Sequence, residues 1–184
     1  MLKKQLQDLK ALKRIQRVES ACEMLQQRYN ELDYMIKMQT KEDVKEFFNV
    51  AELLQDRVAF LQSIYPHIIF RLDLEALEIN SDKIGLSKVI DNIVDNGVKY
   101  SGNSKNIDIQ LIDKKLTIKD YGIGMDELEL IRIFDTYYQA NKEMQGFGIG
   151  LSMVKRYCEK NKIDLSFDSK LKEGTTVTLD FKKV

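Results

Sequence analysis

Apolar side chains recur every three or four residues from residue 2 to about residue 39, with no proline or glycine between them. This spacing predicts one long amphipathic helix, because residues three and four apart share a helix face. From Val18 onward the steps alternate as in bundle helices, whereas the three-residue steps between Leu6 and Val18 leave a bend or short hairpin open. The apolar positions are Leu2, Leu6, Leu9, Leu12, Ile15, Val18, Cys22, Leu25, Tyr29, Leu32 and Ile36.

A helix of this length cannot bury a single apolar stripe on itself, so the stripe needs partner helices. We therefore expect residues 1–42 to form a helical dimerisation segment that pairs with a second copy of the chain. The alternative is a helix that lies flat along its own domain. The charged stretch from Thr40 to Lys45 marks the exit into a second domain, residues 43–184.

The second domain mixes short strand patterns with amphipathic helices, which is typical of an α+β domain. Strands are expected at 47–50, 67–74, 107–112, 116–119, 163–167 and 175–181. Helices are expected at 51–63, from a cap at Ser81 or Asp82 to Tyr100, at 126–134, and after a glycine-rich segment at 146–150.

Composition narrows the function classes. Acidic and basic residues balance at 29 each, which leaves no basic surface for nucleic acid. The N-terminus lacks the apolar block of a signal peptide, and no apolar run approaches a membrane span. Cys22 and Cys158 stand alone, as free thiols do in a reducing cytoplasm.

Two asparagines in the helix around residues 88–101 lie outside its apolar face. Asn92 and Asn96 lie four apart and share one helix face, while Val89 and Ile93 take another. Asparagine is a poor helix former because its amide competes for backbone hydrogen bonds. A solvated face is the simplest explanation of these residues taken alone.

Two glycine-rich segments follow downstream. Asp120, Gly122 and Gly124 come directly after an expected strand, where a carboxylate can accept from an exocyclic amine and glycines let the backbone approach a flat ligand. The segment 146–150 opens a helix, and such loops present backbone N–H groups to phosphate. It is neither a phosphate loop of the Walker type nor preceded by the strand of a dinucleotide fold.

In this order and spacing, the segments resemble the sequence boxes of sensor histidine kinases over roughly residues 46–184. The helix before them resembles the second helix of that family's dimerisation and phosphotransfer hairpin. The corresponding segments are Asn92–Ser101 (N box), Asp120–Gly124 (first glycine box), Phe134 with Tyr137 and Tyr138 (F box), Gly146–Leu151 (second glycine box) and the turn Gly174–Thr176.

The resemblance implies a two-layer α/β sandwich with a mixed sheet, the ATP-binding domain shared with type II topoisomerases and Hsp90 chaperones, preceded by a long bundle-forming helix. It implies a protein-histidine kinase of a two-component system that uses ATP and Mg²⁺. The implied partners are ATP or ADP, a second copy of the chain and a response regulator receiver domain. The implied location is the cytoplasm, either as a separate protein or as the cytoplasmic part of a membrane-bound sensor.

The resemblance also implies roles for individual residues. Asp120 would accept the adenine amino group, Asn96 and Asn92 would hold Mg²⁺, and Lys99 and Tyr100 would contact phosphate, with residues 140–145 as a lid. Amide oxygens suit Mg²⁺, which prefers oxygen ligands. The implied nucleotide-binding residues are Asn92, Asn96, Lys99, Tyr100, Asp120, Gly122, Gly124, Met125, Phe134, Tyr138, Gly146, Gly148, Ile149, Gly150, Leu151 and Thr175.

Four positions depart from patterns of the wider family. Gly97 stands where alanine is usual, Gln139 where a basic residue is usual, and Phe147 where threonine is common. ATP-hydrolysing relatives carry glutamate at position 92 as the base that activates water. Asn92 cannot accept a proton, so the sequence favours a kinase over a hydrolase.

The family's phosphoacceptor histidine has no counterpart in the sequence. The only histidine, His67, follows Pro66 at the start of an expected strand, which indicates a structural residue. We therefore expect a fragment that starts downstream of the acceptor helix and does not phosphorylate itself. The alternatives are a kinase acting on a separate protein and a nucleotide-sensing dimerisation module without kinase activity.

Overall fold

The structure, a computed structural model, describes residues 44–135 and 150–184 and ten positions of the N-terminal segment. The chain divides into two units, Met1–Glu42 and Asp43–Val184. The positions described in the first unit are all helical and exposed: Leu12, Arg14, Ile15, Val18, Glu19, Ala21, Cys22, Leu25, Gln26 and Tyr29. Leu6, where the predicted bend or hairpin begins, lies outside the described residues. Leu32 and Ile36 of the predicted dimer contact lie outside them as well.

The second unit is built on a five-stranded sheet in the order β2-β4-β5-β7-β6. Strand β2 pairs with β4 in parallel and all other neighbours pair antiparallel, which confirms the predicted mixed sheet. The strands are β2 (Ile69–Leu74), β4 (Asn106–Ile112), β5 (Lys115–Asp120), β6 (Asp164–Lys170) and β7 (Gly174–Asp180). A separate antiparallel pair joins β1 (Glu46–Asn49) to β3 (Glu78–Ser81).

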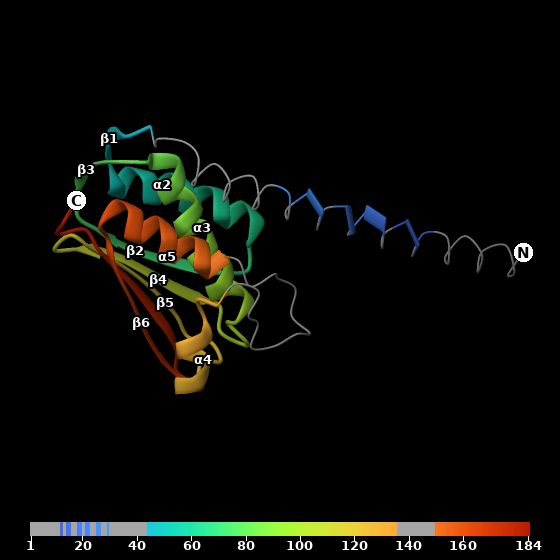
Figure 1. Ribbon diagram of the computed structural model, residues 1–184. Helices are drawn as coiled ribbons and strands as arrows, with labels where there is room; N and C mark the ends of the chain where they lie inside the picture. Colours follow the sequence, from blue (N-terminus) through green and yellow to red (C-terminus); the bar gives the residue numbers. More distant parts are fainter. Residues whose placement is uncertain are drawn as a thin grey trace, which may run out of the picture. The chain divides into compact units, whose positions relative to one another are not determined.

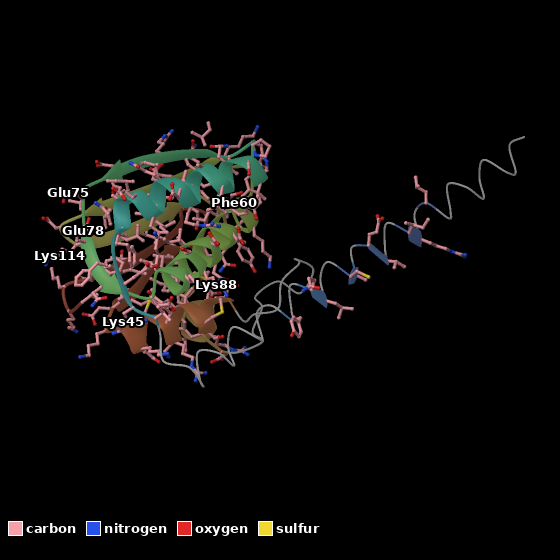
Figure 2. All side chains as sticks on the ribbon, turned by 90° about the horizontal axis from the view of Figure 1, so that it is seen from above. Lys45, Phe60, Glu75, Glu78, Lys88 and Lys114 are labelled. Carbon is pink, nitrogen blue, oxygen red and sulfur yellow. The ribbon has the colours of Figure 1, made fainter. Side chains whose placement is uncertain are left out.

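Helices α2 (Val50–Ile64), α3 (Lys83–Lys99) and α5 (Gly150–Asn161) lie side by side on one face of the large sheet (Figure 1). Helix α3 is the central one, since it contacts α2, α5, β4 and β5. Figure 2 shows the helices from above, with Phe60 marking α2 and Lys88 marking α3. This arrangement confirms the predicted two-layer α/β sandwich.

Helix α3 forms because its sequence supplies a cap and an apolar face. The Asp82 side chain accepts from the backbone N–H of Gly85 at 2.9 Å, which satisfies a donor that the first turn leaves unpaired. Of the two predicted caps, Asp82 is therefore correct. The helical spacing places six residues of this helix towards a core. Five of them are buried, Val89, Ile90, Ile93, Val94 and Gly97, whereas Val98 is only half-buried.

The structure differs from the sequence prediction at four places. Strand β3 was not predicted. His67 is exposed in the turn between α2 and β2, so its predicted place within a strand is wrong; Pro66 interrupts the chain and pairing starts only at Ile69. Helix α4 (Glu127–Arg132) ends before Phe134. Strand β6 runs beyond residue 167 to Lys170, because its pairing with β7 continues to the turn.

Candidate functional site

Asn92 faces the beginning of α5. Its side-chain Nδ2 donates to the backbone carbonyl of Lys88 at 2.8 Å. A carbonyl oxygen only accepts, so this bond fixes the orientation of the amide and leaves Oδ1 pointing elsewhere. A Cβ atom placed on Gly150 would lie 2.5 Å from Asn92 Oδ1, which shows that the oxygen lies against the first residue of α5. The fold therefore brings the two motifs together.

Asn96 lies one helical turn further along the same face of α3 and is half-buried. Its backbone carbonyl accepts from Tyr100 N–H at 2.9 Å, as expected at a helix end. Within the described part of the chain, no hydrogen bond engages the Asn96 side chain. Both asparagines thus keep amide oxygens that can serve an external ligand.

Asp120 lies at the end of β5 and is only 8% exposed. Its Oδ1 accepts from the backbone N–H groups of Gly122 (2.9 Å) and Thr175 (3.2 Å). Burial raises the pKa of this carboxyl above its usual value, and the two N–H bonds oppose that shift. No donor among the described residues reaches Oδ2. One oxygen is therefore held by the chain and the other is available to an external donor.

Close contacts within the chain account for three of the motif glycines. A Cβ on Gly122 would lie 2.0 Å from the Tyr100 carbonyl oxygen, and one on Gly174 would lie 2.2 Å from the Asp120 carbonyl oxygen. Gly124 has a φ of +64°, a left-handed conformation that favours glycine. These residues let backbone segments touch each other. Their contact with a ligand stays a prediction.

The loop after β5 is also held by the turn between β6 and β7. Met125 N–H donates to Ser169 Oγ at 2.9 Å, and Ser169 Oγ lies 2.9 Å from Thr175 Oγ1. Lys172 N–H donates to the Ile123 carbonyl at 2.7 Å. Sequence reasoning missed Ser169, because a serine within a strand carries no motif of its own. This network fixes the loop that carries the Asp120 partner Gly122.

The other predicted residues within the described ranges lie around these elements. Lys99 Nζ lies 4.9 Å from the centre of the Tyr100 ring at the end of α3. The ring of Phe134 packs edge-to-face with Phe167, with 5.3 Å between the ring centres, and Lys155 Nζ lies 5.2 Å from the centre of the Phe134 ring. Leu151 is half-buried in the first turn of α5.

Some predicted site residues cannot be placed. Tyr138, Gly146, Gly148 and Ile149 lie outside the described residues, together with the expected lid at 140–145. A groove of about 500 Å³ runs between α5 and β6. Of the predicted nucleotide-binding residues that the structure describes, only Phe134 lines this groove, and Asp120 does not.

No three His, Cys, Asp or Glu side chains in the described ranges are grouped so as to hold a metal ion. None of the helices there has the length and apolar character that crossing a bilayer requires.

Comparison with known families decides the assignment. Residues 81–184 match the family described as histidine kinase-, DNA gyrase B-, and HSP90-like ATPase. The chain belongs to this family. The match begins at Ser81, just before α3, and therefore includes all the motif segments described above.

Curated proteins with similar sequences are named as sensor kinases or sensor proteins. The chain is 32% identical over 130 residues to sensor histidine kinase YkoH of Bacillus subtilis (strain 168), covering 66% of this chain and 28% of that protein. It is 34% identical over 143 residues to sensor protein BceS of Halalkalibacterium halodurans, covering 73% of this chain and 43% of that protein. The chain thus spans less than half the length of these two relatives.

Solved structures share the fold. The mycobacterial sensor histidine kinase MprB matches with a TM-score of 0.66 at 23% identity, over 74% of this chain and 95% of that one. Full-length ShkA in complex with AMPPNP matches with a TM-score of 0.69 at 17% identity, over 82% of this chain and 34% of that one. Together with the sequence relatives, they confirm the predicted resemblance: the chain carries the ATP-binding domain of a sensor histidine kinase.

Proposed function

We propose that this chain is the nucleotide-binding and kinase part of a two-component protein-histidine kinase. It binds ATP with Mg²⁺ and transfers the γ-phosphoryl group to a histidine, from which a response regulator aspartate receives it. The observation that supports this most is Asp120, a buried carboxylate with one oxygen held by two backbone N–H groups and the other unpaired among the described residues.

Asp120 provides the basis for choosing adenine. The exocyclic amino group of adenine donates hydrogen bonds, and a charged acceptor forms stronger ones than a neutral acceptor. Guanine places a carbonyl oxygen at the corresponding position, which an ionised carboxylate repels. Gly97 lies beside the carboxylate: a Cβ added to it would lie 3.9 Å from Asp120 Oδ2. Because Gly97 has no side chain, position 97 places no side-chain atom beside this oxygen.

The donor set fits Mg²⁺ only together with the substrate. Asn92 and Asn96 would hold the ion through their amide oxygens, and phosphate oxygens and water would supply the remaining ligands. Bound Mg²⁺ would neutralise charge that develops on the phosphoryl oxygens during transfer. The hydrogen bond from Asn92 Nδ2 to the Lys88 carbonyl supports this role, because it leaves Oδ1 directed at the start of α5.

Asn92 also supports transfer to histidine rather than hydrolysis. An amide cannot take a proton from water at neutral pH, so it does not provide the base that hydrolysis uses. An imidazole nitrogen is itself a nucleophile and needs positioning more than it needs a base. The arrangement therefore favours a kinase.

The acceptor is not His67 in this proposal. His67 contacts the ring of Tyr65, and Tyr65 donates from its hydroxyl to Asp95 Oδ1 at 3.0 Å. These residues lie where α2 meets α3. Asn92, in contrast, lies on the side of α3 that faces α5. The nucleophile has to approach the phosphorus within about 3–3.5 Å, and a side chain on the α2 side cannot do so.

The remaining partners belong to the same proposal. Exposed apolar positions on the N-terminal helix, such as Leu12 (56% exposed) and Leu25 (65%), support pairing of two chains through this segment. A response regulator receiver domain and a cytoplasmic setting follow from the sensor kinase relatives.

Two measurements test the proposal. Mg-ADP should raise the melting temperature more than Mg-GDP does, because at the position that would face Asp120 adenine carries an amino group and guanine a carbonyl oxygen. Labelled ATP should then phosphorylate a supplied domain that carries a phosphoacceptor helix, giving acid-labile phosphate. Equal stabilisation by both nucleotides would exclude the role given to Asp120. Nucleotide binding without transfer to several such domains would favour a nucleotide-sensing module instead.

A further inference from the structure

Helix α5 is anchored at its far end by a buried tyrosine. Tyr157 is 0% exposed, and its hydroxyl donates to the backbone carbonyl of Asp82, the N-cap residue of α3, at 2.9 Å. The same oxygen lies 3.2 Å from Ser81 Oγ. A Cβ on Gly85 would lie 2.4 Å from Cε2 of Tyr157 and 2.3 Å from Asp82 Oδ2, so the aromatic ring and the capping carboxylate occupy the space that any other residue at position 85 would fill.

A second contact of the same kind lies at the other end of α5. Gly150 has no Cβ, and Asn92 Oδ1 of α3 lies in the space that this Cβ would take. Gly85 and Asn92 are seven positions apart on α3, and Gly150 and Tyr157 are seven positions apart on α5. The early residue of one helix meets the late residue of the other, so α3 and α5 run antiparallel with two contacts about two turns apart.

The equal spacing ties the two contacts together. Seven residues are close to two helical turns, so both contact residues of each helix lie on nearly the same face. Two turns of α-helix span about 10.5 Å and do not stretch. The position of Tyr157 against Gly85 therefore sets how far α5 extends along α3, and with it the distance from Gly150 to Asn92.

Apolar packing fixes this register less sharply than a hydrogen bond between two named groups does. Met153, Val154 and Cys158 of α5 are buried and hold the helix onto the sheet. Apolar burial is non-directional, so it resists lifting of the helix more than sliding along its axis. The Tyr157 hydroxyl, in contrast, bonds to one carbonyl at one end of α3.

We propose that Tyr157 and Gly85 are positioning residues for the phosphate end of the nucleotide site. They fix the axial register of α5, so that its N-terminus lies against Asn92 at the distance that binding of phosphate and metal requires. The inference rests on the proposed function for its nucleotide readout only. The register itself can be measured without any ligand.

The test compares three variants of the full chain. Tyr157→Phe keeps the ring and removes the hydroxyl. Gly85→Ala displaces the ring and also the Asp82 carboxylate that caps α3, so Tyr157→Phe is the more specific of the two. Tyr65→Phe is the matched control, because it removes a tyrosine hydroxyl that bonds to Asp95 on the α2 side of α3 and does not involve α5. The first readout is the NMR signal of the Asn92 side-chain amide without ligand. The second is the ratio of ADP affinity to adenosine affinity in the presence of Mg²⁺.

Positioning predicts a selective effect. Tyr157→Phe and Gly85→Ala should shift the Asn92 amide signal and lower ADP affinity by about tenfold while adenosine affinity changes less than about twofold. Tyr65→Phe should leave the Asn92 signal and the affinity ratio unchanged. A merely structural role would lower the melting temperature and reduce both affinities together.

Each contrary result is decisive. An unshifted Asn92 signal in Tyr157→Phe overturns the inference, even if Gly85→Ala does not fold. An equal loss of ADP and adenosine affinity overturns the positioning role. If the wild type binds neither ligand, the proposed function fails instead, and the Asn92 signal still decides whether Tyr157 sets the register.

Discussion

Replacing Gly97 by alanine should stabilise the protein, although Gly97 is buried beside Asp120 inside α3. An added Cβ would lie 3.4 Å from Asp120 Cβ and 3.4 Å from Ile107 Cδ1, which is ordinary van der Waals contact. The substitution therefore introduces no clash. It removes a glycine from a helix interior, where glycine costs about 1 kcal/mol relative to alanine.

The expected gain in the free energy of unfolding is about 1–1.5 kcal/mol. Burial of one methyl group adds up to about 0.8 kcal/mol to the helix term. Part of this is lost because the methyl group would lie 3.9 Å from Asp120 Oδ2 and would reduce hydration of a buried charge. For a domain of this size, such a gain raises the melting temperature by about 3–5 °C.

Chemical and thermal denaturation without nucleotide would measure the effect, with Gly122→Ala as the control. The Cβ of alanine at 122 would lie 2.0 Å from the Tyr100 carbonyl oxygen, a backbone atom that cannot yield without moving the chain. That variant should lose at least about 2 kcal/mol. Destabilisation by Gly97→Ala, or similar effects of the two substitutions, would show that the surroundings of Asp120 differ from those described.

Four further predictions concern the site and the assembly. Asp120→Asn should weaken ADP binding in calorimetry yet stabilise the ligand-free protein at pH 7. Because burial raises the folded pKa of Asp120, its charge costs stability above that pKa; denaturation curves should show the difference shrinking as the pH falls towards about 4. Asn96→Ala should abolish transfer to a supplied acceptor without lowering the melting temperature, and retained transfer would remove Asn96 from the mechanism. His67→Gln should leave acid-labile phosphate from labelled ATP unchanged at its low level; a loss of label would make His67 an acceptor. Light scattering should find the variant with glutamate at both Leu25 and Leu32 monomeric, whereas a wild-type monomer at tens of micromolar would contradict dimerisation.

The sequence predicted the elements whose hydrophobic period is strong. Helix α3 shows why: Val89 and Ile93 repeat at helical spacing over enough turns to define a buried face. Strand β3 was missed because it has only four residues and a single apolar side chain, Ile79. A pattern of that length carries too little information to separate a strand from a loop.

The sequence predicted site residues as members of motifs, but not the contacts between them. Asn92 and Gly150 belong to different motifs, and their contact depends on the antiparallel packing of α3 and α5. Gly85 gave no signal at all, because a lone glycine in a helix registers only as a weaker helix former. Its role depends on Tyr157, which is 72 positions away in sequence and can be recognised only once the helices are packed.

The glycines around Asp120 act by orienting the carboxylate. Gly122 N–H can donate to Oδ1 because the absence of a Cβ lets that residue lie against the Tyr100 carbonyl. Thr175 N–H can donate to the same oxygen because Gly174 lies against the Asp120 backbone with a φ of +97°. A side chain at either glycine would move one of the two donors. Both donors engage Oδ1, so the geometry leaves Oδ2 as the oxygen that can receive a hydrogen bond from outside the chain. The motif glycines thus orient Asp120 for the base recognition proposed above, through contacts within the chain.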